Sequence, residues 1–114
     1  MAQDFERTIT NNIDTSFVNI RAASDSDDAI VGIRLVNVSD TTSITVDVKI
    51  VNNNDSDALL GYIIKNAPIP VGSSLELIDS GSKIVVMEHD KIQAKSSINN
   101  SLDVIVSAVD AIST

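Results

Sequence analysis

Residues 68–107 read PIPVGSSLELIDSGSKIVVMEHDKIQAKSSINNSLDVIVS. Short runs rich in Ile and Val alternate there with turn residues at intervals of about eight to twelve positions, which is the spacing of strands in a β-sandwich or barrel. Strands are therefore expected at 74–78, 83–88, 90–96 and 102–109. Between the second and the third of them, Glu88-His89-Asp90 is predicted to form the tight turn of a hairpin, because His and Asp tolerate a positive φ.

The preceding part of the chain has the same character, with strands expected at 5–10, 15–22, 29–38, 44–50 and 59–65. Residues 29–38 are apolar at nearly every position, which is typical of a central strand covered on both faces. Residues 44–50 show the cleanest period-two alternation, which predicts that Val46 and Val48 are buried and that Asp47 faces solvent.

The pattern as a whole predicts an all-β chain that forms an antiparallel, jelly-roll-like β-sandwich of about seven or eight strands, in a single domain over residues 1–114. Pro68 and Pro70 cannot donate to a strand ladder, so the segment between them is expected to be a connection or an edge. The sequence contains no Cys, which excludes a disulfide framework and a thiolate metal site.

The net charge is −8, and the eight Lys and Arg residues are dispersed along the sequence. Nucleic-acid binding needs a basic stripe that neutralises phosphates, so direct contact with DNA or RNA is not expected. The first residues, 1–7, lack the basic and apolar regions of a signal peptide, and no run approaches the ~18 apolar residues of a membrane span. We therefore expect a chain made in a cytosol, with no membrane partner.

Several residues that face away from the expected core are nevertheless apolar, namely Val36, Val38, Val51, Ile105 and Val109. A domain of this size has too little interior to bury both faces of many strands, so some of these side chains are expected to meet another chain. Val36, Val38, Ile105 and Val109 are the predicted interface residues. They indicate a homo-oligomer or an assembled partner.

One motif has the form of an active site, since residues 77–82 match the aspartic-protease signature of two apolar residues, Asp, Ser or Thr, Gly and a small residue. Such an enzyme needs two facing loops and most of a lobe after the motif. The chain after Gly81 is too short for both, so Asp79-Ser80-Gly81 is interpreted as a turn. We predict no catalytic residue and no enzymatic activity.

Metal and ligand motifs are also weak. The Asp-rich loops at 25–28 and 53–57 offer oxygen ligands, yet neither has the Gly and Glu of an EF-hand, so no metal or cofactor is expected. His89 is the only His and has no second His or Cys to complete a metal set. The aromatic residues are Phe5, Phe17 and Tyr62 alone, and this scarcity counts against a carbohydrate-recognition module.

The C-terminal part of the chain resembles small virion structural proteins of tailed bacteriophages. The resemblance rests on Pro-x-Pro-x-Gly-Ser at 68–73, on Lys-Ile-Val-x-x-x-x-Asp-x-Ile at 83–92, and on a last strand with an inward Ser, here Ser107. A Gly commonly stands in the family where this chain has His89, which leaves the turn type open.

The resemblance implies a virion component that is assembled in the host cytoplasm, with the major capsid protein or other virion proteins as partners. Within that class, a capsid decoration or cement protein on the outside of the head is the leading expectation, and a trimer is the favoured oligomer. A neck, tail or fibre-associated β module is the alternative. A carbohydrate-recognition module is the competitor from another class.

Overall fold

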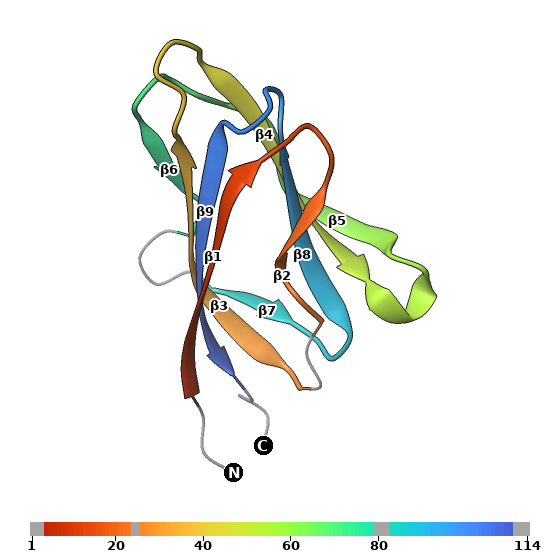
Figure 1. The fold of residues 1–114 in the computed structure, drawn as a ribbon. Coiled ribbons are helices and arrows are strands. Elements are labelled where there is room, and N and C mark those ends of the chain that lie inside the picture. The colour runs from red at the N-terminus through yellow and green to blue at the C-terminus, as the bar shows by residue number, and fades with distance from the viewer. Residues whose placement is uncertain (1–3, 24–25, 79–82, 111–114) are drawn as a thin grey trace.

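A computed structural model describes residues 4–23, 26–78 and 83–110. In these residues the chain forms nine strands and one short 3-10 helix (Figure 1). The strands are β1 (Asp4–Ile13), β2 (Val18–Arg21), β3 (Asp28–Asn37), β4 (Ile44–Asn52), β5 (Ala58–Ile69), β6 (Ser74–Glu76), β7 (Ile84–Val86), β8 (Asp90–Ser96) and β9 (Leu102–Asp110), and the helix η1 (Asn53–Asp55) connects β4 to β5. The predicted all-β class is confirmed.

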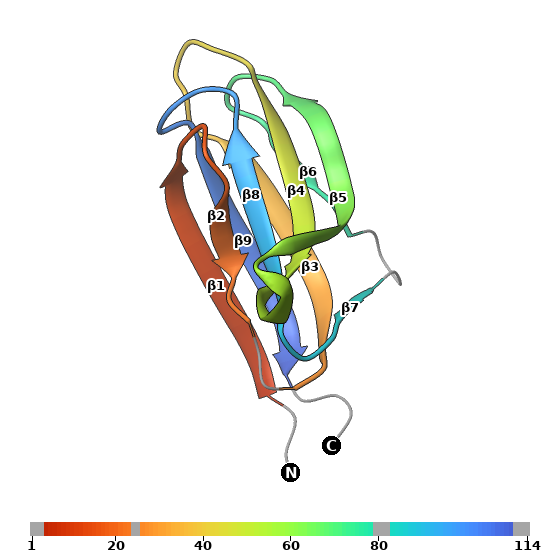
Figure 2. The same ribbon diagram turned by 90° about the vertical axis from the view of Figure 1, so that its right-hand side faces the viewer.

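The strands form two antiparallel sheets that pack face to face (Figures 1 and 2). The first sheet has the order β1-β9-β3-β6, with β7 also paired to β3, and the second has the order β2-β8-β4-β5. Pairing runs from the ends of the chain inward, because β1 pairs with β9, β2 with β8, β3 with β6 and β7, and β4 with β5.

This nested pairing is that of a jelly roll, in which a long antiparallel ribbon wraps into two sheets. It confirms the predicted jelly-roll-like sandwich. Each of the nine ranges expected from the sequence overlaps one strand, so the described part of the chain has nine strands, more than the expected total of about seven or eight. The short strands β6 and β7 both pair with β3.

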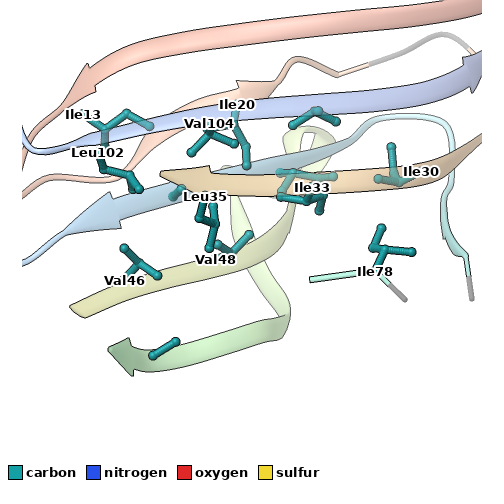
Figure 3. Close-up of a cluster of buried hydrophobic side chains, with 14 of the residues drawn as sticks. Ile13, Ile20, Ile30, Ile33, Leu35, Val46, Val48, Ile78, Leu102 and Val104 are labelled. Atoms are coloured by element: carbon teal, nitrogen blue, oxygen red, sulfur yellow. The ribbon is translucent and has the colours of Figure 1, made fainter. Parts of the chain in front are cut away.

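The core lies between the two sheets and consists mainly of β-branched side chains (Figure 3). Val46 and Val48 are buried as predicted, with 1% and 0% of their surface exposed. Complete burial of a side chain of this size stabilises the fold by about 1.5–3 kcal/mol. The most buried large residues are Ile13, Ile20, Ile30, Ile33, Leu35, Ile44, Ile69, Ile92 and Leu102.

Of two predictions about strand position, the one for residues 29–38 is confirmed in part and the one for the segment at Pro68 is confirmed. β3 is central in the first sheet, between β9 and the pair β6 and β7, but its outer face is open at Arg34, whose side chain is 51% exposed. β5 is the edge strand of the second sheet and extends through Pro68. A proline is tolerated there because an edge strand leaves one side of its ladder unpaired.

The predicted turn at Glu88-His89-Asp90 exists, but the predicted hairpin is wrong. His89 has a φ of 74°, and Asp90 N donates to Met87 O at 3.0 Å. The flanking strands nevertheless belong to different sheets, since β7 pairs with β3 whereas β8 pairs with β2 and β4. The turn therefore carries the chain across the edge of the sandwich.

The expected inward position of Ser107 is also wrong. Ser107 pairs with the exposed Arg7 on one side and with Gly32 on the other. Its neighbours in β9, Val106 and Ala108, are the buried residues. Because successive residues of a strand point to opposite faces, Ser107 lies on the outer face of the first sheet.

The predicted exposure of Asp47 is wrong as well, since this residue is only 7% exposed. The register between β4 and β5 shifts between Val46 and Val48. Across this bulge Asn66 adopts a positive φ of 55°, and its backbone N donates to Asp47 Oδ1 at 2.7 Å. The Asp47 carboxylate is buried because it accepts a hydrogen bond from the backbone of the bulge. The alternation of residues along a single strand does not predict such a bulge.

Val51 lies on an outward face as expected, yet it is completely buried. The end of the β4–β5 hairpin folds back toward β8, where Asn53 N donates to His89 O at 2.8 Å and Lys91 Nζ lies 2.8 Å from Asp57 Oδ1. The chain's own hairpin therefore shields Val51, and no partner is needed to cover it.

Candidate functional site

The outer face of the first sheet carries a group of apolar side chains. The even-numbered residues of β9 are buried, so Ile105 and Val109 point outward and are half-buried. On β1, Phe5 pairs with Val109 and Ile9 pairs with Ile105. Val85 of β7 lies in the same row as Val109, on the other side of β3. We call these five residues the apolar face.

Three members of the apolar face are strongly exposed: Phe5 is 87% exposed, and Ile9 and Val85 are each 50% exposed. The five residues form two rows across the strands, Phe5–Val109–Val85 and Ile9–Ile105, with Arg7 and Ser107 between them. Single exposed apolar residues are ordinary, but apolar rows that span several strands are typical of a contact surface. Phe5 and Ile9 lie on β1, which is an edge strand of the first sheet. The edge leaves backbone donors and acceptors beside the apolar side chains.

The four predicted interface residues do not all lie together. Ile105 and Val109 belong to the apolar face. Val36 is on the same sheet face, but it pairs with Asp103 and Ser74 instead of with apolar residues. Val38 follows the end of β3, where it is 40% exposed. Contact of any of the four with a partner stays a prediction.

A charged cluster lies near the apolar face, where β1, β2, β3 and β9 come together at one end of the sandwich. Arg21 of β2 is 7% exposed, and its guanidinium lies 2.7 Å from Glu6 Oε1 and 2.8 Å from Asp28 Oδ2. Asp28 is completely buried. Ser26 Oγ lies 3.1 Å from Asp28 Oδ1 and 3.2 Å from Asp110 Oδ1. The ion pairs join both sheets.

This cluster shifts the pKa of two of its members. A hydrogen bond with the Asp28 carboxylate raises the pKa of Asp110, and burial and the charges of Asp28 and Glu6 raise it further. Burial disfavours the charge on Arg21, but the hydrogen bonds that its guanidinium donates to Asp28 and Glu6, together with their negative charges, outweigh burial and raise the pKa of Arg21. A proton on Asp110 therefore favours the folded arrangement.

The catalytic motifs considered from the sequence do not form a described site. Asp79-Ser80-Gly81 of the protease-like motif lies outside the described residues. His89 Nε2 is 3.7 Å from Glu88 Oε2, in a partly exposed turn. Within residues 4–23, 26–78 and 83–110, three or more His, Cys, Asp or Glu side chains nowhere form a group that could hold a metal ion.

Three acidic side chains of the Asp-rich loops make internal contacts. Asp27 Oδ1 accepts from Glu88 N at 3.0 Å, and Asp28 pairs with Arg21. In the other loop, Asp57 pairs with Lys91. These acidic side chains therefore hold the loops to neighbouring segments, as is common for Asp in turns.

No helix in the described ranges is long and apolar enough to cross a membrane.

The outer face of the second sheet is different, and sequence patterns gave little sign of it. It contains a hollow of about 290 Å³ between β4, β5 and β8, with a polar lining. Lys95 lines it, and Lys49, which is not a lining residue, shares the Phe17 ring with Lys95 because both ammonium groups lie over this ring. The residues come from distant segments, so only the pairing of β4 with β8 brings them together.

No family model matches the chain, and no curated protein has a significant sequence match to it. Its fold is similar to a chain of the disulfide-linked pili of Bacillus endospore appendages, with a TM-score of 0.55 and 12% identity over 98% of this chain and 88% of that chain. It is also similar to a chain of the acid-stable capsid of Helicobacter pylori bacteriophage KHP30, with a TM-score of 0.54 and 11% identity over 96% of this chain and 87% of that one.

A third similar structure is a chain of the infectious bursal disease virus VP2 subviral particle, with a TM-score of 0.56 and 8% identity over 94% of this chain. The present chain spans only 32% of that viral chain. At these identities the similarity establishes the shared sandwich fold and leaves function to be argued from the surface.

Proposed function

We propose that the chain is a structural protein of a bacteriophage virion, and specifically a decoration or cement protein that docks on the outer surface of the capsid. The observation that carries this proposal is the apolar face, which presents exposed side chains from β1 and β7 on a rigid sheet. The motifs at 68–73 and 83–92 support the phage context, and the similar capsid folds are consistent with it.

The apolar face has the chemistry of a docking surface. Burial of apolar area is the main favourable term in protein association, and an aromatic side chain such as Phe5 is a common anchor at the centre of an interface. A specific contact buries about 800 Å² on each partner. Such a face suits a protein that stabilises a lattice through contacts alone.

The partner in this proposal is the major capsid protein or another virion protein, and the chain itself forms a homo-oligomer. Repeated copies of one chain favour closed symmetry. We favour a trimer, because decoration proteins of the resembled family commonly occupy three-fold positions of a capsid. Light scattering of the purified chain at micromolar concentration would give the number of chains in each particle.

A neck, tail or fibre-associated module of the virion is the second candidate. The similarity to a pilus chain, which extends over nearly the whole of both chains, supports a module that repeats along a filament. A carbohydrate-recognition module remains the competitor from another class, and the scarcity of exposed aromatic rings counts against it.

The copy number in purified phage particles separates these candidates. Quantitative mass spectrometry should find the chain in a fixed ratio to the major capsid protein, with many copies in each particle, if it decorates the head. A few copies, in the ratio of a neck or tail component, would favour the second candidate. Absence from the particle would contradict both.

A further inference from the structure

The hollow on the outer face of the second sheet has the features of a built binding site. It is lined by side chains that offer both hydrogen-bond donors and acceptors, namely Thr15, Thr45, Asp47, Asn66, Lys95 and Ser97. Its volume of about 290 Å³ is near the lower end of small-molecule sites, which start at about 300 Å³. The size therefore suits one small polar ring better than an extended chain.

The walls of the hollow are fixed before any ligand arrives. Thr45 N donates to Ser97 Oγ at 2.9 Å, and Ser97 N donates to Thr45 O at 2.9 Å. Asp47 is held by the N–H of Asn66. Since β4 and β8 are neighbours in the sheet, the hollow keeps its shape without an ordering step, which lowers the cost of binding.

Two charged groups in the hollow are only loosely paired. The Asp47 side chain is 10% exposed, and its Oδ2 lies 3.9 Å from Lys95 Nζ, which is too long for a hydrogen bond. Asp47 Oδ1 is already occupied by the N–H of Asn66. Asp47 Oδ2 can therefore accept a hydrogen bond from a ligand hydroxyl group, and the Lys95 ammonium can donate a hydrogen bond to a ligand oxygen.

A second ammonium, that of Lys49, shares the Phe17 ring with Lys95 and lies outside the lining of the hollow. Lys49 Nζ is 3.9 Å from the centroid of the Phe17 ring, and Lys95 Nζ is 4.9 Å from the same centroid. Within the described residues Lys49 makes no ion pair. An aromatic face attracts a cation but does not neutralise it. One positive charge thus remains for an anionic group of a ligand.

We infer that this hollow binds an acidic saccharide unit, with the carboxylate of a hexuronate-type sugar directed to Lys95 and Lys49 and its hydroxyl groups directed to Asp47, Thr45 and Ser97. A polyol ring matches the mixture of donors and acceptors, and the carboxylate matches the spare ammonium. The Phe17 ring is covered by Lys49 and is not available for stacking, so binding depends on hydrogen bonds. The inference is independent of the proposed virion role. It does not need the aromatic platform whose scarcity counts against a dedicated carbohydrate-recognition module.

The test is a titration of the full chain, followed by amide NMR, with sodium glucuronate, glucose and sodium acetate at equal ionic strength. Glucuronate should shift the amides around Thr45, Asn66 and Ser97, with an affinity of about millimolar and at least tenfold above those of glucose and acetate. Equal affinity for acetate would reduce the site to a general anion site, and equal affinity for glucose would contradict the role of the lysines. Absence of shifts would overturn the proposal.

Matched variants locate the effect. Lys95→Gln should weaken glucuronate binding about tenfold, because a hydrogen bond between two charged groups is lost. Lys65→Gln makes the same change of charge on β5 of the same sheet, over Tyr62 and outside the hollow, and should change the affinity less than twofold. Equal losses in both variants would show a nonspecific charge effect and overturn the site.

Asp47→Asn tests the acceptor while it keeps an oxygen for the N–H of Asn66. It should weaken binding of both sugars, and its thermal unfolding should be compared with that of the unmodified chain. A thymidine oligonucleotide is a further probe. Lysine-dependent binding of this oligonucleotide, in place of glucuronate, would assign the face to nucleic acid and contradict the inference.

Discussion

The two sheets of this sandwich differ in how apolar and polar side chains are arranged on their outer faces. The first sheet presents the apolar face, where Phe5 and Ile9 extend into solvent. The second sheet also exposes apolar side chains, Leu59, Leu60 and Tyr62, but all three lie on its edge strand β5. Its strands β2 and β8 present polar side chains that contact one another, such as Asn19 and Gln93, whose amide groups lie 2.9 Å apart. This difference is the basis of our proposals that another molecule covers the first face and that the hollow on the second face binds a small polar ligand.

The largest effect is expected in the core that both faces share. Val48→Asp places an unpaired charge at a position with 0% exposure, which costs several kcal/mol, on the order of half the stability of a small domain. Urea unfolding should show an unfolded chain or a greatly lowered midpoint. A stable Val48→Asp variant would contradict the inward direction of β4 and with it the assignment of the two outer faces.

The next effect concerns the second face. Asp47→Ala removes the acceptor of the Asn66 N–H at the bulge between β4 and β5, and we expect a loss of about 1–3 kcal/mol in the free energy of unfolding. The matched control is Asp40→Ala, at an exposed loop position, with an expected change within about 0.5 kcal/mol. Equal effects would show that the Asp47 carboxylate is not a structural acceptor.

A smaller effect depends on pH and concerns the charged cluster beside the apolar face. The pKa of Asp110 is raised in the folded chain, so the folded state binds this proton more tightly than the unfolded state does. Its contribution to stability is complete below the ordinary aspartate pKa of about 3.9 and is lost as the pH rises through the raised value.

The variant Asp110→Asn should therefore flatten the stability profile in that range, while Asp40→Asn should leave it unchanged. Thermal unfolding at a series of pH values measures both. The groups that face Asp110 are Asp28, Glu6 and Ser26, and Arg21 pairs with the first two. A profile that keeps its slope in Asp110→Asn would assign the pH dependence to another group.

The smallest effect on stability is expected for the aromatic residues of the two faces. Phe5→Ala and Tyr62→Ala remove side chains that are 87% and 41% exposed. Because Phe5 is the more exposed, Phe5→Ala should change the free energy of unfolding of the monomer by less than about 0.5 kcal/mol. Only Phe5→Ala should weaken self-association in light scattering. A loss of association in Tyr62→Ala alone would place the contact on the second sheet.

Much of the fold was predictable because the alternation of apolar and polar residues matches the observed burial along most strands. The alternation in 44–50 correctly placed Val46 and Val48 in the core, and the turn residues marked the ends of most strands. The prediction failed where the register shifts, as at Asp47, because a bulge between distant strands is a tertiary feature. It also failed at the turn between β7 and β8. A turn of the same form can connect two strands of one sheet or two strands of different sheets, and the sequence does not distinguish the two cases.

The candidate site was only partly predictable for the same reason. Ile105 and Val109 are recognisable in the sequence because they are apolar although they alternate with the residues of β9 that face the core. Phe5 and Val85 join them only through the pairing of β1 with β9 and of β7 with β3. The lysines look dispersed in the sequence, but Lys49, Lys65 and Lys95 all extend from strands of the second sheet.

The central claim, that the apolar face is covered on assembly, is tested most directly by labelling of single cysteines. The chain has no Cys, so Ile9→Cys and Leu60→Cys each introduce one thiol, at positions that are 50% and 55% exposed on different sheets. Both should react with a maleimide at similar rates in the dissociated chain. In assembled particles the rate at Ile9→Cys should fall at least tenfold while the rate at Leu60→Cys stays within about twofold, and undiminished labelling of Ile9→Cys would contradict the account.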